Sequence, residues 1–151
     1  MTREWTRGAY VISTDPRRLD LAIVHAFLAR AYWSVGLPRA VLERAVENSL
    51  VFGLYSPSGQ VGFARVVTDC ATFAYLADVF VLEECRGRGL GKWLVEVAVT
   101  LPELQGLRRW LLATADAHDL YRQFGFTDAE PGRLMEIVDP DVYTRARRGT
   151  E

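Results

Sequence analysis

This 151-residue chain has only two cysteines, no long apolar run and almost no excess of charge of either sign. Cys70 and Cys85 are too few and too widely spaced for a disulfide framework or a zinc site, so we expect free thiols and no metal. The net charge of −1 argues against binding of nucleic acid, which requires an excess of cations. Because no apolar segment resembles a signal peptide or can span a bilayer, we expect no membrane partner and a cytoplasmic location.

What the chain does contain is the composition of an ordinary globular protein. Its residues are 50% apolar and 25% charged, which excludes a disordered chain. Its length suits one domain with a substantial core, and no internal repeat or linker-like change of composition marks a boundary. We therefore expect residues 1–151 to form a single domain, of which residues 143–151 are a flexible tail.

The spacing of apolar and polar residues predicts helices and strands in a definite order. In chain order they are a strand at 9–13, helices at 16–31 and 38–48, strands at 50–55, 60–69 and 71–82, a helix at 89–101, a strand at 108–115, a helix at 116–124 and a last strand at 133–138. Strands come in a block before they alternate with helices. The sequence therefore predicts an α+β fold, with a mixed and mostly antiparallel sheet flanked by helices, rather than a doubly wound parallel sheet.

The segment RGRGLGK, residues 86–92, places three glycines and three cations between a predicted strand and a predicted helix. A P-loop needs a glycine where Arg86 stands and a serine or threonine where Trp93 stands, so that motif fails. A dinucleotide fingerprint needs its third glycine at Lys92, and no βαβ unit precedes the segment, so that motif fails as well. The segment therefore matches neither of these nucleotide-binding loops.

The same segment has the physical properties of an anion site. Glycines lack a Cβ atom, so successive amide N–H groups can turn toward one point and approach a phosphate closely. That point lies at the start of a predicted helix, where the first N–H groups are unpaired and the helix dipole is positive. The alternative is a strained turn with solvated arginines, but such a turn needs one or two glycines and has no use for three cations. The residues of the predicted anion site are Arg86, Gly87, Arg88, Gly89, Leu90, Gly91 and Lys92.

Two stretches of the chain are similar to signatures of a known family. DVFVLEECRGRGLGKWL, residues 78–94, resembles the acyl-coenzyme A binding signature of the GNAT superfamily of N-acetyltransferases. Its pattern is arginine or glutamine, two residues, glycine, one residue, and glycine or alanine, and it is filled by Arg86, Gly89 and Gly91. LYRQFGF, residues 120–126, resembles the family's penultimate helix and the turn out of it. Since the predicted order of elements also matches along nearly the whole chain, the protein is identified as a member of this superfamily.

The resemblance implies a binding mode for acetyl-CoA as co-substrate. The backbone amides of residues 86–91 would hold its pyrophosphate, and its pantetheine arm would pair like an added strand along Val79, Phe80 and Val81. Many family members carry an asparagine seven residues before the helix tyrosine, where this chain has Thr114. Either Thr114 or Asp116 substitutes for that asparagine, or the contact is absent.

The resemblance also implies that Tyr121 donates a proton to the departing thiolate, since a phenol is protonated at neutral pH. The alternative for Tyr121 is an ordinary position on an amphipathic helix. Asp78 is an acid within an otherwise apolar strand, where an unpaired charge is costly to bury. It accepts the proton of the attacking amine directly or through water, anchors a cationic substrate, or forms a salt bridge with an arginine such as Arg65 on the neighbouring strand. His118, three residues before Tyr121, is the other residue of a type suited to the base role, and its alternative is a solvent-facing or capping position at the start of the helix.

In the fold of this family, the first two helices and the loop between them usually wall the acceptor site. That loop contains Tyr32, Trp33 and Ser34, followed by a break at Gly36. Aromatic rings beside the acid Asp78 could receive an ammonium or an aromatic group. The alternative is that the rings seal the edge of the core.

These expectations combine into one function and one alternative. We expect an N-acetyltransferase that moves the acetyl group of acetyl-CoA onto a primary amine of a small molecule, and less readily of a peptide, by direct attack in a ternary complex. The alternative is a non-catalytic module that binds or senses acyl-CoA. Because dimers are common in the resembling family, a homodimer is also expected.

Overall fold

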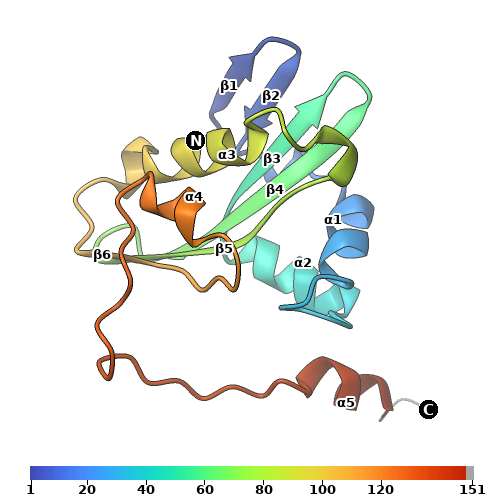
Figure 1. The fold of residues 1–151 in the computed structure, drawn as a ribbon. Coiled ribbons are helices and arrows are strands. Elements are labelled where there is room, and N and C mark those ends of the chain that lie inside the picture. Colours follow the sequence, from blue (N-terminus) through green and yellow to red (C-terminus); the bar gives the residue numbers. More distant parts are fainter. Residues whose placement is uncertain (149–151) are drawn as a thin grey trace.

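The structure is a computed structural model that describes residues 1–148 of the chain (Figure 1). At its centre is a six-stranded sheet whose strands follow one another in chain order. Neighbouring strands are antiparallel except β5 and β6, which run parallel. The predicted α+β fold with a mixed, mostly antiparallel sheet is therefore confirmed. The strands are β1 (Glu4–Arg7), β2 (Tyr10–Ser13), β3 (Leu50–Ser56), β4 (Gly59–Thr68), β5 (Phe73–Val81) and β6 (Arg109–Leu111).

Helices cover both faces of this sheet. α1 (Leu21–Leu28) and α2 (Arg39–Glu47) pack on one face, and α3 (Leu90–Val99) packs on the other (Figure 1). The short α4 (His118–Arg122) follows β6, and α5 (Val142–Arg148) comes last. Short 3₁₀ turns lie at Pro16–Arg18, Glu83–Cys85 and Pro102–Leu104.

Each face of the sheet has its own core cluster, because adjacent strand residues point to opposite faces. In β4, Phe63 packs with residues of α1 and α2, whereas Ala64 and Val66 pack with residues of α3. Since both faces are covered, β3 and β4 are buried at nearly every position rather than at alternate ones. Phe52 and Phe63 are completely buried, and replacing either by alanine costs about 3–5 kcal/mol. The sheet is thus a fixed frame for the site.

The predicted helices are present, with one difference. α2 and α3 lie where the sequence places them, and the apolar stripe of α3 is buried. The helix predicted at 16–31 is instead a 3₁₀ turn followed by α1. Two aspartates explain the interruption, because Asp15 and Asp20 each accept a hydrogen bond from a backbone N–H at the start of the element that follows.

The strands before and after the central block differ more from expectation. β1 was not predicted, because its residues are polar and mostly exposed; it forms a hairpin with β2. β6 covers three residues of the strand predicted at 108–115. The chain leaves the sheet early because Thr114 Oγ1 accepts a hydrogen bond from the Ala117 amide at 3.0 Å, which forms the turn into α4.

The prediction of a strand at 133–138 is wrong. These residues form neither strand nor helix, and their apolar side chains are exposed, by 46% at Leu134, 96% at Met135, 102% at Ile137 and 61% at Val138. The alternation of apolar and polar residues suits a strand, but a strand also needs a neighbouring strand to pair with. The segment pairs with no strand among residues 1–148.

The C-terminal part of the chain runs from α4 past β6 and then away to α5 (Figure 1). Residues 127–142 are all exposed, and Tyr143 on α5 is the next partly buried residue. Of the tail predicted at 143–151, residues up to 148 belong to the helix α5, and residues 149–151 lie outside the described part. The flexibility of this tail and the single domain stay predictions. No helix among residues 1–148 is long and apolar enough to cross a membrane. The cytoplasmic location also stays a prediction.

Candidate active site

β5 and β6 separate part-way along their length. They pair over three residues each, after which β6 ends at Leu111 while β5 continues to Val81. On its other side β5 keeps pairing with β4, but the register shifts after Phe63, and Asp78 has a φ of 57°. A bulge therefore bends β5 at Asp78, and its last residues have no described partner strand on the β6 side.

A groove of about 440 Å³ lies between the end of β5, the start of α3 and the residues around α4. We call it the loop groove, because the glycine segment forms part of its wall. Nine of the twelve residues predicted to contact acetyl-CoA line it: Val79, Phe80, Val81, Arg86, Gly87, Gly89, Leu90, Gly91 and Asp116. The other three, Arg88, Lys92 and Thr114, do not.

The glycine segment has the backbone geometry of an anion site. Gly87 and Gly89 have φ angles of 80° and 76°, a region that residues with a Cβ atom rarely adopt. A Cβ at either position would meet nothing within 4 Å, so the backbone angle, and not crowding, requires glycine. Gly89 is the N-cap of α3, and no side chain caps this helix end. The first amides of α3 are therefore available to an anion.

The cations of the segment make contacts with the protein as well. Arg86 donates from Nε to the carbonyl oxygen of Val81 at 3.0 Å, which ties the segment to the end of β5. Arg88 donates to the hydroxyl of Tyr10 on β2 at 2.7 Å. Lys92 is exposed. The two arginines thus fix the position of the turn, and all three cations place positive charge near it.

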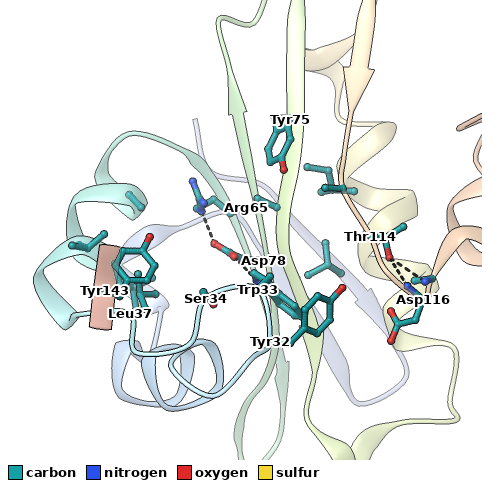
Figure 2. A pocket seen from close by; sticks show the side chains of 18 of the residues that line it. Tyr32, Trp33, Ser34, Leu37, Arg65, Tyr75, Asp78, Thr114, Asp116 and Tyr143 are labelled. Carbon is teal, nitrogen blue, oxygen red and sulfur yellow. Dashed lines mark hydrogen bonds and ion pairs between the residues drawn. The ribbon is translucent and has the colours of Figure 1, made fainter. Parts of the chain in front are cut away.

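A second cavity, of about 360 Å³, lies on the α2 side of the bulge (Figure 2). We call it the aromatic pocket, because five of its lining residues are Tyr32, Trp33, Tyr75, Tyr121 and Tyr143. Figure 2 shows Arg65 and Asp78 in its middle, Tyr143 and Leu37 at one end, and Thr114 and Asp116 toward the other. Its size is that of a small-molecule site.

The loop groove and the aromatic pocket meet. Five residues line both cavities, and we call this set the junction: Trp33, Val79, Asp116, Ala117 and Tyr121. The shared residues come from the α1–α2 loop, the bulged part of β5 and the region of α4. The separation of β5 from β6 thus leaves room for a molecule in the groove to touch one in the pocket.

Asp78 lies between an arginine and a tryptophan. Its Oδ2 accepts a hydrogen bond from Arg65 Nε at 2.8 Å, and its Oδ1 accepts one from Trp33 Nε1 at 2.9 Å. Arg65 also donates to Ser49 Oγ at 3.1 Å. The salt bridge that was one alternative for Asp78 is present, and it is well shielded, with side chains 18% exposed at Arg65 and 11% at Asp78. The bulge residue is therefore held at both carboxylate oxygens.

Comparison with known proteins decides the family. The sequence model of the acetyltransferase (GNAT) domain matches residues 47–128. This chain belongs to the GNAT acetyltransferase family. It is 35% identical over 150 residues to the candidate acetyltransferase FG08082 of Gibberella zeae. The alignment covers 83% of this chain and 84% of that relative. The identification made from residues 78–94 and 120–126 is confirmed.

Solved structures of candidate acetyltransferases show the same fold. A candidate GNAT acetyltransferase from Xanthomonas campestris pv. campestris is 46% identical, with a TM-score of 0.87 over 92% of this chain and 99% of that one. A more distant candidate acetyltransferase from Clostridium acetobutylicum, whose crystal structure was determined with acetyl-CoA, is 12% identical. Its TM-score is 0.63 over 91% of this chain and 96% of that one, which shows a common fold.

Tyr121 lies at the junction and is half-buried. Burial raises the pKa of its phenol above the ordinary value, and the neighbouring Tyr32 and Asp116 raise it further. Tyr121 is therefore a protonated group at neutral pH. Its ring also packs edge-to-face against Phe126, with centroids 5.9 Å apart, which orients it.

The α1–α2 loop beside the aromatic pocket is held by contacts of its own residues. Tyr32 and Trp33 are 60% and 44% exposed, and their rings pack edge-to-face with centroids 5.1 Å apart. The Tyr32 hydroxyl accepts a hydrogen bond from the Ala115 amide at 3.1 Å. Ser34 lines the pocket, but its hydroxyl donates to the Leu28 carbonyl at 2.6 Å, so this donor is engaged in the loop itself.

Several residues of the site were not predicted. Ala117 and Leu120 line the groove beside Tyr121. Ala117 is the N-cap of α4, four residues before Tyr121, and its place at the start of the predicted helix is a signal that could have found it. Tyr75 lines the same pocket as Asp78 although they are three residues apart, because the bulge resets the alternation. No local pattern marks Tyr143. Among the described residues no group of three or more His, Cys, Asp or Glu side chains could hold a metal ion.

Proposed function

We propose that this GNAT protein is an N-acetyltransferase that moves the acetyl group of acetyl-CoA onto a primary amine of a small molecule. The junction is the observation that carries the proposal, because the loop groove and the aromatic pocket share its residues. A thioester in the groove and an amine in the pocket would be in contact there. Holding both reactants together supplies the proximity that direct transfer in a ternary complex requires.

The loop groove suits acetyl-CoA. The uncapped amides of α3, reached through Gly87 and Gly89, are a cradle for its pyrophosphate. The pantetheine arm would extend along residues 79–81, where β5 lacks a partner strand on one side and can hydrogen-bond like the edge of a sheet. The Clostridium protein, which has this fold, binds the same compound. Thr114 lies outside the groove lining, so Asp116 is the better substitute for the family's asparagine.

The chemistry follows from the groups at the junction. The lone pair of the neutral amine attacks the thioester carbonyl carbon, the C–N bond forms and the C–S bond breaks. Tyr121 gives its proton to the departing thiolate, and its raised pKa keeps it protonated until then. Backbone N–H groups near Val79 would stabilise the negative oxygen of the transition state. The proton of the amine passes to Asp78 directly or through water, using lone pairs that Arg65 and Trp33 leave free.

Two measurements test this function. Thermal unfolding with acetyl-CoA, ADP and NAD should show a selective rise in Tm with acetyl-CoA, because binding to the folded state stabilises it. A panel of primary amines, followed by release of free thiol, should then show turnover. Binding without turnover of any amine would favour a module that senses acyl-CoA. The absence of any Tm shift at millimolar acetyl-CoA would contradict both.

We also propose that the chain is a homodimer. Two features of the described residues support it: β6 is an edge strand that pairs on one side, and the exposed apolar segment 133–138 pairs with nothing. A sheet edge and an unpaired segment of strand-like pattern in one chain are complementary, so two copies can satisfy both. Glu136 and Arg109 carry opposite charges for such a pairing.

A further inference from the structure

The two ends of the aromatic pocket differ in chemistry. Toward the junction it presents the polar groups of Asp116 and Tyr121. At the other end α2 and the loop before it turn apolar side chains to the pocket, and α5 adds an aromatic one (Figure 2). The residues of this apolar end are Leu37, Val41, Leu42, Ala45 and Tyr143.

Among residues 1–148, the lining of the pocket has no free carboxylate at its apolar end that could pair with a second cation of the acceptor. The charged residues in its lining are Arg65, Asp78 and Asp116. Arg65 and Asp78 neutralise each other across 2.8 Å. Asp116 belongs to the junction, where the reacting amine would lie. The part of an acceptor that reaches the apolar end should therefore itself be apolar. Burying apolar surface there is favourable, whereas burying an unpaired ammonium is costly.

Tyr143 is the residue with which the C-terminal part of the chain contributes to the aromatic pocket. Sixteen exposed residues, 127–142, precede it. Its own side chain is partly buried against the core cluster that contains Leu37 and Leu42. This packing places the ring in the lining of the pocket, beside Leu37 in Figure 2.

We propose that Tyr143 determines acceptor specificity: α5 lays its ring against the loop and α2 to complete an apolar end that receives an alkyl or aryl group of a primary amine with a single positive charge. The inference rests on the proposed function, since it takes the aromatic pocket as the acceptor site. It names the acceptor class as arylalkyl and alkyl monoamines, in preference to polyamines and aminosugars. A cavity of about 360 Å³ is large enough for a phenylethylamine-sized molecule.

The kinetic test compares phenylethylamine with spermidine at saturating acetyl-CoA. The wild type should have the higher kcat/KM for phenylethylamine. Tyr143→Ala should raise KM for phenylethylamine about 10-fold with little change in kcat or in KM for acetyl-CoA, because it removes binding surface remote from the reacting atoms. Tyr143→Phe is the matched control, since it keeps the ring, and should behave as the wild type. Removal of residues 141–151, which deletes α5, should reproduce the effect of Tyr143→Ala.

A binding measurement separates this inference from the proposed function. Titration of phenylethylamine into the CoA-bound protein, followed by calorimetry, needs no turnover. Tyr143→Ala and the truncated chain should bind the amine about 10-fold more weakly, as in the kinetic test. If the wild type acetylates no amine, the proposed function fails, while weaker binding by the two variants still supports the role of Tyr143. Equal binding by wild type and both variants, or a wild type that prefers spermidine, overturns the inference.

Discussion

Arg65 Nε lies 2.8 Å from Asp78 Oδ2, across the two strands whose register shifts between them. Asp78 has the positive φ of 57° that the bulge requires, a conformation that costs a non-glycine residue about 1–3 kcal/mol. The pair and the hydrogen bond from Trp33 hold Asp78 there. The bulge lies three residues beyond the last β5–β6 pair, Tyr75 with Leu111, so the Arg65–Asp78 pair holds β5 where it borders the opening in which both cavities lie.

We expect Asp78→Asn to lower both stability and activity. Asparagine tolerates the positive φ, so the backbone is little affected, but the variant leaves the cation of Arg65 without its partner. The free energy of unfolding should fall by about 1–3 kcal/mol, measured by urea denaturation. The double variant Arg65→Met with Asp78→Asn should lose less free energy of unfolding than the two single variants lose together. Additive effects would mean that the two side chains do not interact in solution, contrary to the structure.

Tyr121→Phe should lower kcat by about 10²-fold or more, because it removes the proton for the thiolate and keeps the ring. The dissociation constant of acetyl-CoA should stay within about twofold, measured by calorimetry. Since burial raises the pKa of Tyr121, the phenol stays protonated through neutral pH, and the loss of kcat due to its ionisation should begin at a higher pH than the ionisation of a free phenol would produce. An unchanged kcat in Tyr121→Phe would remove this residue from the mechanism.

Gly89→Ala should weaken the binding of acetyl-CoA about 10-fold or more. The φ of 76° strains a residue with a Cβ atom by about 1–2 kcal/mol, and relaxing that strain moves the amides of the loop groove. Gly106→Ala is a matched control, because Gly106 has a φ of 78° and lies outside the lining of the groove. It should lose similar stability and bind acetyl-CoA normally. Equal losses of affinity in both variants would show that general destabilisation, and not the loop, is the cause.

Ile137→Lys should break the proposed homodimer. Ile137 is 102% exposed in the single chain, so the change should leave the fold of that chain intact. Light scattering at about 50 µM, a concentration at which a micromolar dimer is mostly assembled, should show a dimer for the wild type and a monomer for the variant. Val67→Lys, an exposed apolar position on β4, is the control and should remain dimeric. A monomeric wild type would contradict the proposal.

The parts of the fold and site that the sequence predicts are those with local causes. The segment 86–92 determines its own conformation, since Gly87 and Gly89 provide positive φ angles and α3 follows directly. The apolar stripe of α3 identifies its buried face by helical spacing alone. For these reasons one stretch of sequence was enough to predict most of the residues that line the loop groove.

The parts that could not be predicted depend on residues far apart in the sequence. Trp33 and Asp78 are 45 positions apart, and no local pattern indicates that one donates to the other. Tyr143 reaches the pocket only because its side chain packs against a cluster whose residues come from much earlier in the chain. The segment 133–138 has the alternation of a strand, but a strand also needs an available partner, which the local sequence does not specify.

A crystal structure of the protein with acetyl-CoA would show whether the loop groove holds the thioester next to the aromatic pocket. We expect the pyrophosphate on the amides of residues 86–91 and the thioester carbonyl at the junction, within reach of Tyr121 and open to the aromatic pocket. Acetyl-CoA bound elsewhere, or with its thioester turned away from the aromatic pocket, would contradict this expectation.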